Sequence, residues 1–306
     1  MSSRLDTLLS LETTKCGMKE RVILILILSK FRISFLVTFT AIAGYVLAVG
    51  QISPRIFLLG VAIFILASGS CALNQYQERE IDKSMARTRG RPLPSGRLEP
   101  LAALRIALSL IFAASLILFY GINGKAMALG LLAIFWYNGL YTYLKRKTAF
   151  AVLPGALIGM IPPLLGWVSG GGHLFDPRIW GIAFFFFIWQ VPHFWLLSLE
   201  VAKDYESAGL PSITKIFSVS QIKRIVFIWF LSTGASCLLI PLFGFGDFIP
   251  IRIFLVGATF WLVWSGVRFF KSPFPGSALR RAFTNINLYA FLVLSSLLLD
   301  KLVMIL

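Results

Sequence analysis

The stretch IFLLGVAIFILASGSCALNQYQEREID, residues 56–82, begins as an apolar run and ends in amides, carboxylates and an arginine. The apolar part approaches the roughly 20 residues that a helix needs to cross a bilayer. Asn74, Glu78 and Asp82 recur every four residues, so a helix places them on one polar stripe. Glu80 falls on roughly the opposite side. The segment therefore predicts a membrane span that ends either in a solvated face or in a reaction site.

The composition extends this interpretation to the whole chain. Of its 306 residues, 58% are hydrophobic and only 14% are charged, with a mean hydropathy of +0.82. A soluble domain of this length could not stay dispersed with so little charge. We expect an all-α polytopic membrane protein with nine transmembrane helices, near residues 33–50, 55–76, 101–120, 125–144, 149–168, 179–200, 224–243, 250–269 and 285–305.

The chain divides into two parts. Residues 1–30 predict a cytoplasmic N-terminal segment whose short apolar run, 22–28, forms an interfacial helix, and residues 31–306 predict one membrane domain. Cys16, Cys71 and Cys237 form no CxxC pair, so we expect small buried thiols rather than a zinc site or a disulfide framework.

The basic residues fix the orientation. Once the spans are threaded with the N-terminus inside, 23 of the 29 Lys and Arg residues fall on the cytoplasmic side. The net charge of +16 therefore follows topology and indicates no nucleic-acid partner. An even number of spans separates the ends of the second and sixth, so segments 74–97, 141–147 and 200–215 all emerge on the cytoplasmic face.

Two features next to Asp82 favour a reaction site. Three oxygen-bearing side chains on one stripe suit Mg²⁺, which proteins commonly hold with one or two carboxylates plus substrate phosphates. Directly afterwards, RTRGRPLPSGR places Arg87, Arg89 and Arg91 in a Gly/Pro-rich loop. Because guanidinium groups match phosphate oxygens, carboxylates beside arginines indicate a metal-bound diphosphate. Ordinary cytoplasmic charge explains some of these arginines but not the carboxylates.

Segments 141–147 and 200–215, with the helices that lead into them, also carry polar and charged residues that could face the same site. His193, Glu200 and Asp204 share one face if residues 193–204 form one helix, and Lys203 stands beside Asp204. Tyr141 and Lys145 share a face at the end of the fourth span. A lone histidine in an apolar helix is more often a packing residue than a ligand, and most of the aromatic residues nearby are expected to face lipid or core.

These residues resemble a known superfamily. NQYQEREIDKSMARTRGRPLPSG (74–96) is similar to the first motif of the UbiA-type intramembrane prenyltransferases, N-x-x-x-D-x-x-x-D followed by an arginine loop, and YTYLK (141–145) to their Y-x-x-x-K element. KRKTAFAVLPGALIGMIPPLLGW, WQVPHFW and AKDYESAGLP resemble the protoheme IX farnesyltransferase branch. Glu78 stands where the family usually has Asp, and Phe31 where it usually has proline.

The resemblance implies a nine-helix bundle around a central cavity in the cell inner membrane. It implies Mg²⁺-dependent transfer of a farnesyl group from farnesyl diphosphate to a vinyl group of haem b, with the bilayer and haem A synthase or a terminal oxidase assembly as partners. Carried over by position, Asn74, Glu78, Asp82 and Asp204 hold the metal, Arg87, Arg91, Tyr141, Lys145 and Lys203 bind diphosphate, and His193 lies near the acceptor.

Two alternatives remain open from the sequence. The same fold can prenylate another acceptor, such as a quinone-precursor aromatic or a chlorin ring, because residues 79–96 also partly resemble the chlorophyll- and tocopherol-type enzymes. A transporter is the second alternative, since charged residues and broken helices occur in transporters too. Transport sites, however, lie near the bilayer midplane, whereas these carboxylates gather at one face.

Overall fold

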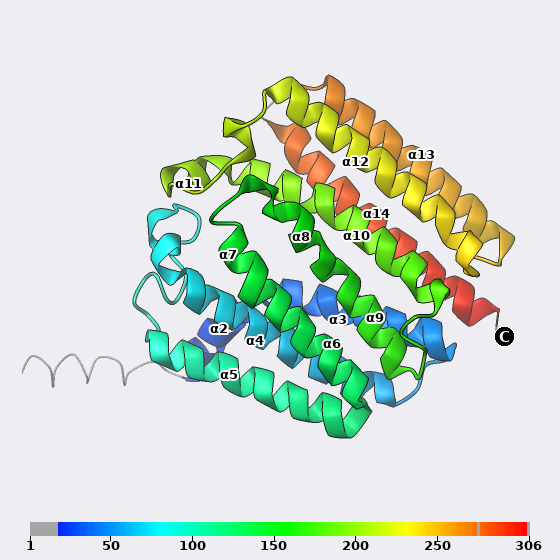
Figure 1. Ribbon diagram of the computed structural model, residues 1–306, viewed down its shortest axis with the longest axis horizontal. Helices are drawn as coiled ribbons and strands as arrows, with labels where there is room; N and C mark the ends of the chain where they lie inside the picture. Colours follow the sequence, from blue (N-terminus) through cyan, green and yellow to red (C-terminus); the bar gives the residue numbers. More distant parts are fainter. Residues whose placement is uncertain (1–17, 274–275, 305–306) are drawn as a thin grey trace, which may run out of the picture.

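The computed structural model describes residues 18–273 and 276–304, which fold as an α-helical bundle (Figure 1). Nine helical segments of this described part are long and apolar enough to cross a membrane, as the sequence predicts. They are Phe31–Val49, Arg55–Ser84, Pro100–Ile122, Gly124–Leu144, Ala149–Ser169, Pro177–Glu200, Val219–Phe243, Ile249–Lys271 and Ser277–Val303. The first 17 residues of the predicted N-terminal segment, with Cys16, lie outside the described residues; Cys71 and Cys237 are buried free thiols.

The second span, α4 (Arg55–Ser84), is longer than the predicted window of 55–76. A helix of 30 residues is about 45 Å long, whereas the apolar core of a bilayer is about 30 Å thick. The surplus lies at the end that carries Asn74, Glu78 and Asp82. The polar stripe therefore continues the helix past its apolar run instead of unravelling into a loop.

A short helix, α2 (Met18–Leu28), precedes the first span, α3 (Phe31–Val49). The predicted segment 22–28 is therefore helical, and its place at the membrane interface stays a prediction. Gln75 Nε2 of α4 donates to the carbonyl oxygens of Ile27 and Leu28, at 3.1 and 2.7 Å. These two carbonyl groups at the C-terminal end of α2 therefore have a hydrogen-bond partner outside their own helix. Between α2 and α3, Lys30 adopts a left-handed conformation with φ of 46°.

The fourth and fifth spans are irregular. In the fourth, α6 (Gly124–Ile134) passes into a π-helical segment, η2 (Phe135–Tyr141), and then into α7 (Thr142–Leu144). In the fifth, η3 (Ala149–Ala151), α8 (Val152–Ala156) and η4 (Leu157–Met160) precede α9 (Ile161–Ser169). Pro162 and Pro163 lie in the first turn of α9, where a missing amide hydrogen costs nothing. The two prolines therefore do not end the span, which runs from Ala149 to Ser169.

The sixth to ninth spans complete the bundle. The sixth is α10 (Pro177–Glu200), which α11 (Ala202–Ser207) and the turn η5 (Ile213–Lys215) follow; the seventh is α12 (Val219–Leu239) with η6 (Ile240–Phe243). The eighth and ninth are α13 (Ile249–Lys271) and α14 (Ser277–Val303). The third span is α5 (Pro100–Leu116) continued by η1 (Ile117–Ile122). Large apolar side chains are exposed on the surface of the bundle, among them Phe57, Phe112, Ile253 and Phe260, as expected of a surface in contact with lipid.

Glycines let α3 and α9 approach closely. A Cβ atom at Gly166 would lie 1.8 Å from the Ala41 carbonyl oxygen, and one at Gly44 would lie 2.2 Å from the Pro163 carbonyl oxygen. Both collisions are with backbone atoms of the facing helix, which cannot rotate away. Small residues that allow backbones to meet are typical of helix contacts in membranes.

We therefore expect Gly166→Ala to destabilise the protein by about 1–3 kcal/mol or more, because α3 and α9 must separate. Thermal unfolding in detergent, followed by circular dichroism, measures the change. Gly257→Ala is the matched control, since no atom lies within 4 Å of a Cβ built there. An unchanged midpoint for Gly166→Ala would contradict the close contact of the two helices.

Candidate active site

The amide and carboxylates of α4 face the interior. Asn74, Glu78 and Asp82 are all buried, as a four-residue spacing on one helix requires. Glu80 points the other way: its side chain is 65% exposed and pairs with exposed Lys83 at 2.7 Å. The stripe is therefore buried and distinct from the solvated face of the same helix.

Each buried carboxylate has a cationic partner from another segment. Glu78 Oε1 lies 2.6 Å from Lys145 Nζ at the end of α7, and Asp82 Oδ2 lies 2.7 Å from Arg91 Nη1 in the loop after α4. Burial lowers the pKa of Lys145, but the Glu78 carboxylate, together with the hydroxyl groups of Tyr205 and Tyr141, holds that pKa above its ordinary value. Two of the three predicted segments, 74–97 and 141–147, thus meet.

Lys30 is a further member of this cluster that the sequence interpretation counted only as cytoplasmic charge. Its Nζ donates to Asn74 Oδ1 at 3.2 Å, and Tyr137 Oη donates to the same oxygen at 3.3 Å. The Asn74 amide nitrogen donates to Thr142 Oγ1 at 3.1 Å. Burial lowers the pKa of Lys30, so an anion beside it would favour its charged form. The signal in the sequence was its place at a helix junction, directly before an apolar span.

The arginines in the loop after α4 differ in their burial and in their contacts with the carboxylates of α4. Arg91 is half-buried on Asp82, and Thr88 Oγ1 donates to the Asp82 carbonyl oxygen at 3.0 Å, which ties the loop to α4. Arg87 and Arg89 are exposed, and no ion pair joins either to the described residues. The structure thus brings Arg91 to the carboxylates but leaves Arg87 at the surface.

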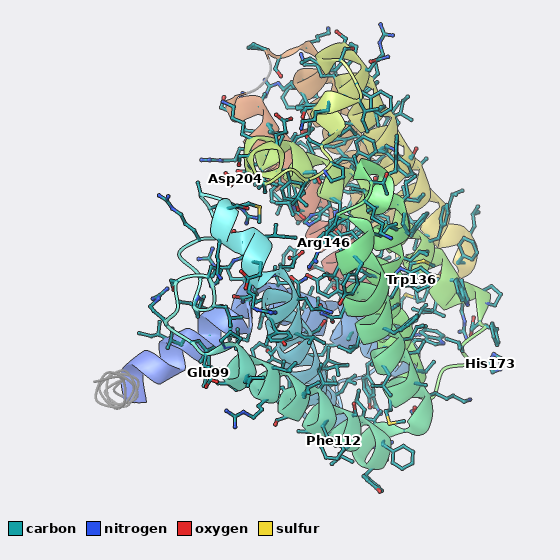
Figure 2. The ribbon with its side chains drawn as sticks, turned by 60° about the vertical axis from the view of Figure 1, so that its left-hand side comes forward. Glu99, Phe112, Trp136, Arg146, His173 and Asp204 are labelled. Atoms are coloured by element: carbon teal, nitrogen blue, oxygen red, sulfur yellow. The ribbon has the colours of Figure 1, made fainter. Side chains whose placement is uncertain are left out.

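The prediction that His193, Glu200 and Asp204 share one helix face is wrong. The helix α10 ends at Glu200, and Val201 has non-helical dihedral angles (φ −106°, ψ 12°), so Asp204 lies on the separate helix α11. Within the described ranges, no hydrogen bond or ion pair joins Asp204 to Asp82. Figure 2 nevertheless shows Asp204 on the side of the bundle that carries Glu99 and the loop after α4, away from His173.

Two cavities flank α11. One, about 980 Å³, is lined by Lys203 and Asp204 together with Glu200, Arg280 and Arg281. A small one is lined by Tyr141 and Lys145 together with Tyr205 of α11. The third segment therefore reaches the cluster through Tyr205, while Lys203 and Asp204 face the larger cavity.

The donor set fits magnesium only in company with substrate. Across residues 18–273 and 276–304, no three His, Cys, Asp or Glu side chains gather closely enough to hold a metal ion. Asn74, Glu78 and Asp82 supply one amide and two carboxylates on one buried stripe. Since Mg²⁺ takes oxygen ligands and is commonly held by one or two carboxylates plus phosphate oxygens, the residues present fit it once a diphosphate adds its own oxygens.

A row of aromatic rings leads from this cluster into the bundle. Tyr137 stacks on Tyr141 with ring centroids 5.9 Å apart, and Tyr141 stacks on Phe194 at 5.4 Å. Lys145 Nζ lies 5.6 Å from the Tyr141 ring centroid, so the predicted shared face of these two residues exists. His193 follows Phe194 and hydrogen-bonds through Nδ1 to Asn287 Oδ1 at 2.7 Å. The π faces of such rings attract cations.

The chain is similar to known prenyltransferases over most of its length. The model of the UbiA prenyltransferase family matches residues 37–292. A protoheme IX farnesyltransferase of Oleidesulfovibrio alaskensis is 33% identical over 278 residues, which cover 90% of this chain and 95% of that protein. A protoheme IX farnesyltransferase of Geobacter sulfurreducens is 39% identical over 219 residues, 72% of this chain and 81% of that protein.

Solved structures share the fold. A UbiA homolog from Aeropyrum pernix K1 superposes with a TM-score of 0.71 at 18% identity, covering 88% of this chain and 98% of that one. A UbiA homolog from Archaeoglobus fulgidus, bound to GPP and Mg²⁺, gives 0.63 at 14% identity, covering 90% and 99%. Helix arrangement, the buried stripe with its cationic partners, and the sequence matches agree, and the chain belongs to the UbiA prenyltransferase family.

Proposed function

We propose that this chain transfers a farnesyl group from farnesyl diphosphate to a vinyl group of haem b. One observation carries the proposal: two buried carboxylates and an amide on α4 meet Lys145, Arg91 and Lys30 at one end of the bundle. The names of the relatives from O. alaskensis and G. sulfurreducens support the acceptor and the donor.

Asn74, Glu78 and Asp82 would hold Mg²⁺, which when bound neutralises part of the charge on a departing diphosphate. The A. fulgidus homolog bound to GPP and Mg²⁺ supports this part of the proposal. We further propose that Asp204 joins these ligands from α11, and that Arg87 and Lys203 add to the diphosphate contacts once substrate is present.

The cations of the cluster stabilise the leaving group. As the bond between farnesyl C1 and the diphosphate oxygen breaks, negative charge grows on the diphosphate, and preorganised positive groups lower the energy of that transition state. Lys145 and Lys30 approach from α7 and the α2–α3 junction, Arg91 from the loop, and Tyr141 flanks Lys145. The three cations, Lys30, Arg91 and Lys145, are already ordered by their contacts with α4.

Farnesyl transfer breaks one carbon–oxygen bond and forms one carbon–carbon bond. The farnesyl group leaves as an allylic cation, diphosphate departs with the bonding electron pair, and the vinyl double bond of haem b supplies the electrons for the new carbon–carbon bond. The resulting cation on the porphyrin side takes up one water molecule and releases one proton, which gives the hydroxylated product, haem O. The rings of Tyr141 and Phe194 would shield the allylic cation from other water and attract its charge.

The distribution of basic residues supports an orientation and a compartment for this proposal. Because 23 of 29 basic residues lie on the side where α4 ends, we place that end and the N-terminus in the cytoplasm and the spans in the cell inner membrane. Haem A synthase or a terminal oxidase assembly would then take up the product.

The acceptor is tested directly by product mass. Purified protein is incubated with farnesyl diphosphate and Mg²⁺, and with either haem b or 4-hydroxybenzoate. We expect a new haem heavier than haem b by one farnesyl group and one hydroxyl group, and no prenylated benzoate. Prenylation of the benzoate alone would overturn the acceptor and leave the family untouched. The buried stripe at one end of α4 disfavours a transporter, whose site would lie near the midplane.

The length of the Glu78 side chain gives a further prediction. We expect Glu78→Asp to keep transfer within about tenfold of the native rate, because the carboxylate is retained for metal binding. Glu78→Gln should lose about a hundredfold or more, since a charge at the leaving group's metal site is removed. Initial rates of haem O formation measure both. Equal rates for Glu78→Gln and the native protein would remove Glu78 from the site.

A further inference from the structure

Two contacts between side chains join α10 to α14, and the two helices lie side by side in Figure 1. His193 Nδ1 lies 2.7 Å from Asn287 Oδ1, and Glu200 Oε1 lies 3.8 Å from Arg280 Nε. The two contacts are seven residues apart on each helix, in opposite directions, so the helices are antiparallel and in register. Seven residues of helix span about 10 Å. The His193 imidazole and the Arg280 guanidinium therefore lie about 10 Å apart along the line of contact between α10 and α14. We call this line of contact the α10–α14 seam.

The imidazole is held in one tautomer. Asn287 Nδ2 donates to the Phe283 carbonyl oxygen at 2.6 Å, so its Oδ1 faces His193 and accepts the hydrogen of Nδ1. This arrangement leaves the lone pair on Nε2, and none of the hydrogen bonds within residues 18–273 and 276–304 involves Nε2. A neutral imidazole whose other nitrogen donates to a fixed oxygen is the usual arrangement of a metal-ligating histidine.

Flat aromatic surfaces surround this imidazole. The ring centroids of Trp189, Phe283 and Phe194 lie 5.0, 5.1 and 5.7 Å from that of His193. Phe194 in turn stacks on Tyr141, beside Lys145. A planar acceptor at His193 would thus lie next to the aromatic row that begins at the diphosphate cluster.

The cytoplasmic end of the seam is cationic on its α14 side. Arg280 and Arg281 line the cavity of about 980 Å³ from α14, whereas Glu200, Asp204 and Glu206 line it from α10 and α11. The Arg280 side chain is 82% exposed and its contact with Glu200 is long, so its guanidinium is free to take another carboxylate. Guanidinium groups bind carboxylates in bidentate fashion.

We infer that the α10–α14 seam binds the acceptor as an iron porphyrin, with His193 Nε2 as the axial ligand of the iron and Arg280 and Arg281 on the two propionate carboxylates. This inference rests on the proposed function and adds the coordination and the anchoring of its acceptor. An iron porphyrin has its metal at the centre and its carboxylates on one edge, which matches an imidazole about 10 Å along the seam from the arginines. Asn287 is a positioning residue that acts through His193.

The coordination is tested by spectroscopy without farnesyl diphosphate. Ferric haem b is added to the purified protein, and electron paramagnetic resonance and the Soret band report the axial ligand. We expect a histidine signature in the native protein, its loss with a drop in affinity of about tenfold or more in His193→Gly and His193→Gln, and its recovery on adding imidazole to His193→Gly. A histidine signature that survives both substitutions would overturn the inference.

The positioning role of Asn287 is tested by a separate measurement, the reduction potential of the bound iron. Asn287→Asp places a carboxylate on Nδ1–H, which makes the imidazole a stronger donor and should lower the reduction potential of the bound iron. The midpoint potential is measured by spectroelectrochemistry of the haem b complex. An unchanged potential would remove Asn287 as the positioning residue of an iron ligand.

The anchoring is tested with haem b dimethyl ester, which lacks the carboxylate charges. Native protein should bind the ester about threefold to tenfold more weakly than haem b, as expected for exposed pairs. Arg280→Gln/Arg281→Gln should bind both compounds equally, whereas Lys271→Gln, an exposed charge at the end of α13, should keep the preference. Equal binding by the native protein, or a preserved preference in the double variant, would overturn the anchoring.

The outcomes separate this inference from the proposed function. The protein could form farnesylated haem although its haem spectrum does not depend on His193. That result would contradict coordination of the iron by His193, but it would agree with the proposed function. A protein that neither binds haem b nor farnesylates it, yet prenylates 4-hydroxybenzoate, would overturn both.

Discussion

Asp82→Asn should lower kcat for farnesyl transfer by about a hundredfold to a thousandfold or more, with the protein still inserted and folded. The side chain keeps its size but loses the charge that faces Arg91 and the proposed metal. Removing one group that stabilises charge in a transition state costs about this much in other enzymes. Initial rates of haem O formation at saturating farnesyl diphosphate, together with a gel-filtration profile in detergent, measure the effect.

Glu80→Gln is the matched control for Asp82→Asn. It removes a carboxylate two residues away on the same helix, but from the exposed side that pairs with Lys83. We expect its rate to stay within about twofold of the native rate, because exposed pairs contribute little. If both variants lost transfer equally, general charge at the end of α4 would explain the result, and the buried stripe would have no special role.

Lys145→Met should both abolish transfer and destabilise the protein by about 3–5 kcal/mol. The substitution leaves Glu78 as a buried carboxylate without its ion-pair partner, and breaking one side of a buried pair costs about this much. It also removes a cation from the place where the diphosphate gains charge. The melting temperature in detergent and the rate of product formation are the two measurements.

The double variant Glu78→Gln/Lys145→Met separates the two effects. With no uncompensated charge left, it should recover most of the stability lost in Lys145→Met, but none of the transfer. Recovery of transfer in the double variant would mean that Lys145 serves only to neutralise Glu78, which would contradict its proposed role at the diphosphate.

Much of this architecture could be predicted from local sequence. Each span is an apolar run of sufficient length, and the four-residue spacing of Asn74, Glu78 and Asp82 places them on one face of any helix. Glu80 was expected on the other side and is exposed there. These features depend on helix geometry alone, so no tertiary information was needed to predict them.

Contacts set by tertiary structure could not be predicted in the same way. The break at Val201 separates Asp204 from His193, although no Gly or Pro lies between Glu200 and Asp204 to mark it. Lys30 itself adopts the left-handed conformation between α2 and α3 and contacts Asn74, which lies 44 residues further along the chain. The pairing of His193 with Asn287 depends on the register of α10 and α14, which a single sequence does not contain.

Binding of a non-reactive farnesyl thiodiphosphate tests most directly whether the α4 stripe and its cations hold a magnesium diphosphate. Isothermal titration is done with and without Mg²⁺ on the native protein, Asp82→Asn and Glu80→Gln. Tight binding that requires Mg²⁺, is kept in Glu80→Gln and is lost in Asp82→Asn is the predicted result. Equal affinity in all three proteins, whether or not Mg²⁺ is present, would contradict the account.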